Sequence, residues 1–143
     1  MCFPVSSESN KHLGYPIMVH PTEANVAVKK ENEITPIRRT LLRSAPVEGL
    51  PGWETRLYMI EYSPRADGSG HHHPVVGLGY MLSGTILSAF ANDEPASINE
   101  GESFVDAAHL VHTVSRNASA TAPARFVIAY TVKQNEPVTV QPE

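Results

Sequence analysis

The chain has 143 residues, a formal net charge of -4 with histidine neutral, 41% hydrophobic residues and 18% charged residues. This length fits one domain, and a domain of that size buries roughly 70% of the surface that its unfolded chain exposes. Lys and Arg are scattered rather than gathered in a basic stripe that could grip phosphates, so nucleic acid is not an expected partner.

Residues 1–33 predict an irregular lead segment, because Pro4, Pro16 and Pro21 interrupt it. The lead has no positive region followed by an apolar run, so we expect no signal peptide and a cytoplasmic location. Its single cysteine, Cys2, has no partner for an internal disulfide. No stretch of the chain approaches the ~20 apolar residues of a membrane span, so we expect no membrane contact. The lead could pack on the rest of the molecule or on a partner subunit.

From residue 34 onward, short apolar or alternating runs are separated by turn residues. The runs that predict strands are ITPIRRTLLRSA, TRLYMIEYS, PVVGLGYML, TILSAFA, ASINEG, ESFVDA, LVHTVSRN and ARFVIAYTV. Strands bounded by turn signals every ~8–12 residues are typical of an all-β sandwich or barrel. No window shows a capped apolar pattern with the ~3.6-residue period of a helix. The sequence therefore predicts a single all-β domain over residues 34–143.

The seven histidines are the strongest chemical signal in this chain. Five of them fall into two groups, His71-His72-His73 and His109 with His112. Side chains two residues apart on a strand face the same way, so His71 and His73 converge if that face is interior, and His72 points away. His112 on an antiparallel neighbour can then close a triangle of imidazoles around one metal ion. The alternative is a chance pair in a histidine-rich chain, or an exposed turn.

The surroundings of these histidines resemble the two motifs of the cupin superfamily. HHHPVVGLGYMLSG resembles the first motif, and GESFVDAAHLVHTVSRN resembles the second, which ends at Asn117. The upstream LPGWETRLYMIEYSPRADGSG resembles the strand and turn that precede the first motif. The resemblance covers residues 35–135 and implies a small single-domain cupin, a jelly-roll or double-stranded β-helix barrel. It also implies one divalent metal ion held by His71, His73 and His112.

One departure from the family pattern affects the expected ligands. The glutamate ligand of the first motif would fall at Gly77, which has no side chain. The resemblance therefore implies three histidines without a carboxylate. Gly77, Gly79 and Met81 should face the same side as the ligands and leave room for a substrate. Because three neutral imidazoles leave the metal charge uncompensated, we expect an anionic, chelating or enolisable small molecule, such as a 2-hydroxy acid, a β-diketonate or a catecholate.

Three functions are compatible with such a site. Iron(II) on three histidines resembles cupin dioxygenases, so an Fe(II) dioxygenase acting on a small organic acid or ketone is the first hypothesis. Zn, Ni or Mn in the same place would support a non-redox isomerase, cyclase, decarboxylase or dehydratase that stabilises an enolate. The third is a small-molecule-binding cupin without catalysis, in which loss of the glutamate abolished metal binding. The resemblance also implies a homodimer.

Other side chains were open to two interpretations. The strand TRLYMIEYS has two faces, and either could line the barrel. If Glu61 faces inward, burial would raise its pKa and make it a catalytic acid or base, whereas outside it is a solvated carboxylate. His109 is a candidate for proton transfer at the barrel mouth. We expect Tyr80 and Phe104 in the core, and Asp106 in a turn or at the rim.

Overall fold

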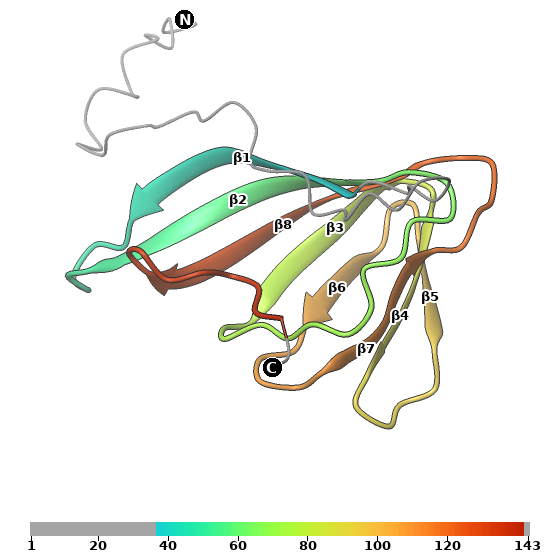
Figure 1. Ribbon diagram of the computed structural model, residues 1–143. Helices are drawn as coiled ribbons and strands as arrows, with labels where there is room; N and C mark the ends of the chain where they lie inside the picture. The colour runs from blue at the N-terminus through green and yellow to red at the C-terminus, as the bar shows by residue number, and fades with distance from the viewer. Residues whose placement is uncertain (1–36, 142–143) are drawn as a thin grey trace, which may run out of the picture.

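Eight β-strands form the described part of the chain, residues 37–141 (Figure 1). Their bounds in the computed structural model are β1 (Ile37–Pro46), β2 (Trp53–Tyr62), β3 (Gly77–Ser83), β4 (Thr85–Phe90), β5 (Ala96–Asn99), β6 (Ser103–Asp106), β7 (His112–Asn117) and β8 (Ala124–Lys133). The all-β prediction is therefore confirmed. Within the described range, no helix has the length and apolarity that crossing a membrane requires. The lead segment predicted for residues 1–33 lies outside the described residues.

The strands pair into two antiparallel sheets. The larger sheet has the order β1-β2-β8-β3-β6, and the smaller sheet has the order β5-β4-β7. The chain passes repeatedly between them, because β4 and β5 lie in the smaller sheet, β6 in the larger and β7 in the smaller again. Figure 1 shows the long strands of the larger sheet running across the view, with β4, β5 and β7 as a second layer at the right. This arrangement fits the jelly-roll barrel expected from the sequence.

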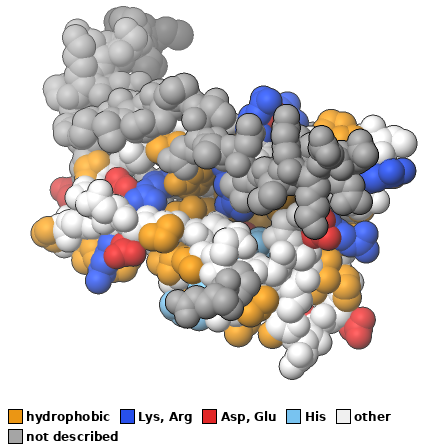
Figure 2. Space-filling view, viewed as in Figure 1, with side chains coloured by type: hydrophobic (Ala, Val, Ile, Leu, Met, Phe, Trp, Pro, Cys, Tyr) orange, Lys and Arg blue, Asp and Glu red, His pale blue; other side chains and the backbone are white. Residues whose placement is uncertain are grey.

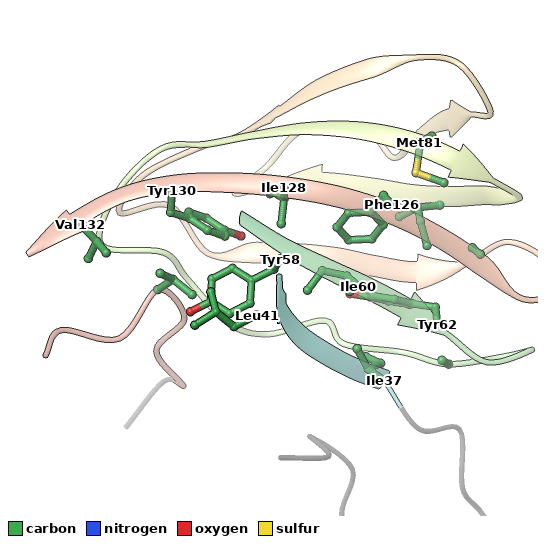
Figure 3. Packing of buried hydrophobic residues seen from close by; sticks show 14 residues of the cluster. Ile37, Leu41, Tyr58, Ile60, Tyr62, Met81, Phe126, Ile128, Tyr130 and Val132 are labelled. Atoms are coloured by element: carbon green, nitrogen blue, oxygen red, sulfur yellow. The ribbon is translucent and has the colours of Figure 1, made fainter. Parts of the chain in front are cut away.

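The core lies on the inner face of the larger sheet, and β8 is its central strand. Every second residue of β8 is buried. Tyr58 and Ile60 of β2 lie opposite Ile128 and Phe126 of β8 in the strand register, and Figure 3 shows these side chains gathered over one face of the sheet. Fully burying a side chain of this size contributes about 1.5–3 kcal/mol. The core therefore anchors the wall from which the candidate site is built.

The structure identifies the face of β2 that lines the barrel. Tyr58, Ile60 and Tyr62 are buried, whereas Leu57 is exposed and Glu61 is only half-buried. The inward face is therefore aromatic and aliphatic, and Glu61 lies on the outer face.

Strand β3 alternates in the same way, with glycines and a methionine inward. Gly79 and Met81 are buried, while Leu78 is 63% exposed and Tyr80 is 47% exposed. The prediction that Tyr80 belongs to the core is therefore wrong, because its neighbours on either side take the inward positions. Phe104 is half-buried and packs against the core cluster.

Charged side chains of both signs are interspersed over the described surface that Figure 2 shows, among orange hydrophobic side chains. On this view the described residues form no continuous basic stripe.

Candidate metal centre

The first two histidines of the site come from the connection between β2 and β3, outside any regular strand. His71 forms an isolated antiparallel bridge with His112, the first residue of β7, and His73 forms a parallel bridge with Ala108. The two bridges keep the chain extended, so the alternation expected of a strand is retained. His71, His73 and His112 are 4%, 1% and 4% exposed, whereas His72 is only half-buried.

The three buried imidazoles converge on one point. The Nε2 atoms of His71 and His73 are 3.2 Å apart, and Nδ1 of His112 lies 3.3 Å from Nε2 of His71. One ring nitrogen from each of the three histidines lies within 4.8 Å of the others. The predicted proximity of these side chains is therefore confirmed, and together they could hold a metal ion.

Hydrogen bonds at the outer nitrogens of two of these rings show that those nitrogens carry protons. Nδ1 of His71 donates to the carbonyl oxygen of Gly68 at 2.5 Å, and Nδ1 of His73 donates to that of Val138 at 2.7 Å. A carbonyl oxygen only accepts, so each Nδ1 carries a proton and each ring directs its Nε2 atom inward. Burial lowers the pKa of His71 to about 4, so its ring is neutral at pH 7.

His112 is held in a similar way by different neighbours. Its Nε2 lies 2.8 Å from Oγ of Ser88 on β4, and Phe90 stacks on the ring with centroids 4.0 Å apart. Burial lowers the pKa of His112 to about 4, and Asp106 opposes that shift. The imidazole is therefore neutral at pH 7, the form in which histidine binds metal ions.

These distances fit a metal coordination sphere. Metal–nitrogen bonds of about 2.0–2.1 Å place neighbouring ligand atoms about 2.8–3.5 Å apart in octahedral or tetrahedral geometry. Both nitrogen–nitrogen separations, 3.2 and 3.3 Å, fall in that range. Two inward lone pairs at such a separation repel each other unless a cation or a proton lies between them. The donor set therefore suits a divalent ion that accepts imidazole ligands, such as Fe, Zn, Ni or Mn.

The histidines line a cavity whose free volume is about 20 Å³. That volume accommodates about one water molecule or one ion. Its walls include Ile98 and Phe104 from one side, and Ile60 and Phe126 from the core. A substrate of several atoms therefore requires side chains at the wall to move when it binds.

Arg39 brings a positive charge to the same cavity, and nothing in the sequence pattern pointed to it. Its Nη1 donates to Oγ1 of Thr139 at 2.9 Å. Its Nε is buried and has no hydrogen-bond partner among the described residues. Leaving a buried donor unsatisfied costs about 1–3 kcal/mol. An acceptor atom of a bound ligand would remove that cost.

Two candidate catalytic residues of the sequence lie elsewhere. Glu61 is on the outer face of the larger sheet, where Oε1 pairs with Arg125 at 3.2 Å and Oε2 with Arg38 at 3.8 Å. Glu61 therefore does not face inward, although its expected role as a catalytic acid or base required that position. His109 is exposed, has a positive φ of 64°, and donates its backbone N–H to the carbonyl oxygen of His73 at 2.7 Å. Through this bond the backbone of His109 supports the segment that carries His71 and His73.

The residues predicted to leave space for a substrate face inward, but the space is filled. A Cβ atom at Gly77 would lie 2.5 Å from Cε1 of Tyr130, and one at Gly79 would overlap the ring of Phe104. Met81 is fully buried in the core cluster. The structure differs here from the expectation, because the glycines admit two aromatic rings to the cavity wall.

Asp106 is the site residue that the sequence reasoning placed wrongly. It is 6% exposed rather than at the rim, and its Oδ2 lies 3.4 Å from Nε2 of His73. The hydroxyl of Tyr130 donates to the same oxygen at 3.5 Å. The signal that could have located it is strand alternation, since Asp106 is two residues beyond Phe104 and shares its inward face.

The model of the cupin domain family matches residues 58–130, a segment that includes all three buried histidines. Comparison with curated proteins finds no match.

Solved structures with the same fold share little sequence with this chain. A cupin-2 domain from Rhodospirillum rubrum has a TM-score of 0.59 at 12% identity, covering 91% of this chain and 76% of that one. An RmlC-like cupin from Shewanella frigidimarina has a TM-score of 0.53 at 14% identity, covering 81% of this chain and 97% of that one. Oxalate oxidase in complex with glycolate has a TM-score of 0.51 at 20% identity, covering 61% of this chain and 45% of the oxidase. This chain thus matches less than half of that oxidase.

Proposed function

We propose that this chain, which belongs to the cupin domain family, is a metal-dependent enzyme acting on a small chelating organic anion. The observation that carries the proposal is the convergence of the buried Nε2 atoms of His71 and His73, which lie 3.2 Å apart. The backbone hydrogen bonds on their Nδ1 atoms orient both rings so that Nε2 points inward. His112 supplies the third nitrogen.

Iron(II) is the metal that we favour, and dioxygenation is the reaction. When bound, iron(II) would supply the chemistry by which both atoms of O₂ enter the substrate, which itself provides the electrons. The protein residues bind and orient the substrate, while the apolar wall excludes water. Because the imidazole set also accepts zinc, nickel and manganese, metal identity is part of the test.

Arg39 supports the proposal that the substrate is an anion. Its buried Nε lacks a partner among the described residues, while its Nη1 is held by Thr139. A guanidinium held in this way suits a carboxylate. The structural neighbour oxalate oxidase was solved with glycolate, a small 2-hydroxy acid. A compound of this class would chelate the metal at one end and meet Arg39 with a carboxylate oxygen.

The experiment that tests the function measures metal and oxygen together. The untagged chain, its His73→Ala variant and the control His72→Ala are assayed for metal by mass spectrometry and for O₂ uptake with 2-hydroxy acids, 2-keto acids and β-diketones. His72 neighbours the site but is only half-buried and lies outside the converging group. We expect near-stoichiometric iron in wild type and control, its loss in His73→Ala, and oxygen uptake that requires iron.

Two results would replace this function with another. Stoichiometric zinc, nickel or manganese without oxygen uptake would favour a non-redox isomerase, cyclase, decarboxylase or dehydratase. Absence of metal from all three proteins, even after anaerobic loading, would leave a small-molecule-binding cupin without metal chemistry.

We also infer that the chain forms a homodimer through the outer face of the larger sheet. Leu78 of β3 lies beside Val105 of β6 in the register, and the two are 63% and 58% exposed. Leu57 and Tyr80 are on the same outward face and are 36% and 47% exposed. Exposed apolar side chains that are contiguous across a sheet are typical of a protein contact surface.

A further inference from the structure

We propose that Asp106 is a fourth ligand of the metal ion, and that it supplies from β6 the carboxylate that the glycine at position 77 cannot supply. This inference rests on the proposed metal site and adds a ligand to it. Asp106 lies outside the group of three histidines whose ligand atoms are all within 4.8 Å of one another, so binding the same ion requires its side chain to shift toward them. The motif pattern of the sequence did not point to Asp106.

The strand register places Asp106 next to the missing ligand. Gly77 of β3 and Asp106 of β6 are directly opposite each other in the antiparallel pair. Opposed residues of neighbouring strands project their side chains from the same face of the sheet. A carboxylate on Asp106 therefore enters the cavity about one strand spacing, ~4.8 Å, away from a side chain on residue 77.

A side chain at position 77 would collide with Tyr130. The added Cβ atom would lie 2.5 Å from Cε1 and 3.0 Å from Cζ of that ring. Tyr130 is buried, and its hydroxyl donates to Oδ2 of Asp106 at 3.5 Å. The aromatic ring thus occupies the volume that a ligand side chain from β3 would need, and its hydroxyl orients the carboxylate from β6.

The distance from Asp106 to His73 suits two ligands of one metal ion. Its Oδ2 lies 3.4 Å from Nε2 of His73, close to the 3.2 Å that separates this nitrogen from Nε2 of His71. Neighbouring ligand atoms on one metal are about 2.8–3.5 Å apart. Because Nδ1 of His73 donates to the carbonyl oxygen of Val138, Nε2 is the ring atom that faces the carboxylate. A cation between Nε2 and Oδ2 would contact both atoms.

The charge of the cavity also favours a cation at this point. Asp106 is 6% exposed, and a carboxylate buried to this extent is costly unless a positive group or several donors stabilise it. Among the described residues, the contact of Asp106 that can become an ion pair is the one with His73, at 3.4 Å, and Arg39 lines the same cavity. A divalent ion bound by three neutral imidazoles and one carboxylate would carry one net positive charge.

The test measures metal affinity rather than turnover. Untagged wild type, Asp106→Asn, Asp106→Ala and the control Glu100→Gln are stripped of metal and titrated with Co²⁺ and Mn²⁺ at constant pH by calorimetry. The visible absorption of the Co²⁺ forms is recorded in parallel. Glu100 is exposed in the turn between β5 and β6, so its substitution changes net charge without touching the cavity. Thermal unfolding of the metal-free proteins verifies that each variant is folded.

We expect Kd for both ions to rise at least tenfold in the two Asp106 variants and to change less than twofold in the control. The Co²⁺ spectrum of the Asp106 variants should differ from wild type, because a carboxylate oxygen is lost. Affinity and spectrum equal to wild type in Asp106→Asn would overturn the inference while the three-histidine site stands. If His73→Ala and wild type alike bind no metal, the inference fails together with the proposed function.

Discussion

At the scale of single residues, the candidate site is organised by hydrogen bonds on the far side of each ring. Carbonyl oxygens of Gly68 and Val138 accept from two of the imidazoles, while Ser88 meets the third. Partners of this kind fix the tautomer and orientation of a metal-binding histidine, and their loss weakens metal affinity about 10–100-fold. The partner of His112 at 2.8 Å is a side chain, so substitution can remove it, whereas the partners of His71 and His73 at 2.5 and 2.7 Å are backbone carbonyl oxygens.

Ser88→Ala should therefore weaken metal binding about tenfold without abolishing it, because Nε2 of His112 loses its partner at 2.8 Å. The measurement is a competition titration of the metal-free protein with a chromogenic chelator. Ser97→Ala, an exposed position on the neighbouring strand β5, is the control. An unchanged affinity in Ser88→Ala would show that His112 is oriented by the stacked ring of Phe90 instead.

Arg39→Gln should raise the Kd of glycolate or another small carboxylate at least tenfold and leave the metal content unchanged. The reason is that Gln removes the positive charge next to the histidines while retaining polar atoms. Arg38→Gln is the matched control, since the Arg38 side chain is 62% exposed and pairs with Glu61 on the outer face. Equal carboxylate affinity in wild type and Arg39→Gln, measured by calorimetry on the metal-loaded proteins, would contradict the anion-binding role of Arg39.

At the scale of elements, strand β3 has glycines at two of its inward positions, Gly77 and Gly79. Its inward glycines bring the sheet backbone close to the rings of Tyr130 and Phe104. Those rings form part of the cavity wall, and Tyr130 also reaches Asp106. A substitution at either glycine should act on the wall of the site as well as on the core.

Gly79→Ala should destabilise the fold by about 1–3 kcal/mol, because its methyl group overlaps the ring of Phe104 and interiors tolerate added volume poorly. Urea denaturation compared with wild type gives the value. Leu78→Ala, one residue away on the exposed face, should stay within about 0.5 kcal/mol of wild type when measured under conditions in which the chain is monomeric. A Gly79→Ala protein as stable as wild type would mean that Phe104 moves aside freely.

The Gly77→Glu variant is a second test of how tightly side chains pack against β3. The glutamate of the family pattern should not restore a stronger site here, because its Cβ would meet Tyr130 at 2.5 Å. We expect lower stability in urea and no gain in metal affinity. A tighter metal complex in this variant would show that Tyr130 yields to the new side chain.

The sequence predicted the fold and the meeting of the histidines because both follow from periodicity. Alternation alone places His71 and His73 on one face, and the structure confirms it although these residues lie outside a regular strand. Alternation did not identify the inner face of β2, because tyrosines and a glutamate occupy its two faces in a pattern that fits either side. Alternation with Phe104 could have placed Asp106 on the inward face, but its position opposite Gly77 depends on the pairing of β6 with β3, which is set by contacts between distant segments. That these residues bind a metal stays a prediction.

At the scale of the whole molecule, the larger sheet has two unlike faces. One carries the core and the candidate site, and the other carries exposed apolar side chains on β3 and β6. A second copy of the chain on the outer face would cover these side chains and leave the cavity on the opposite face accessible.

The combined substitution of Leu78 and Val105 by lysine should convert the proposed dimer into a monomer, because it places like charges on both copies of the outer face. Light scattering coupled to size-exclusion chromatography gives the mass directly. Leu50→Lys is the control, since Leu50 is 44% exposed in the turn between β1 and β2. A wild-type protein that elutes with the mass of a single chain would contradict the dimer.

The bridges around His71, His72 and His73 have a consequence for when the site forms. His72 exchanges backbone hydrogen bonds with Val140, and His73 is held by Val138, 65 positions along the chain. His112 is 41 positions from His71 and belongs to strand β7 of the smaller sheet. Contacts between such distant residues form late, because closing long loops is entropically costly. A metal ion held by these three histidines would therefore bind only after the segment around Val138 has emerged and docked, so that metal binding would follow folding.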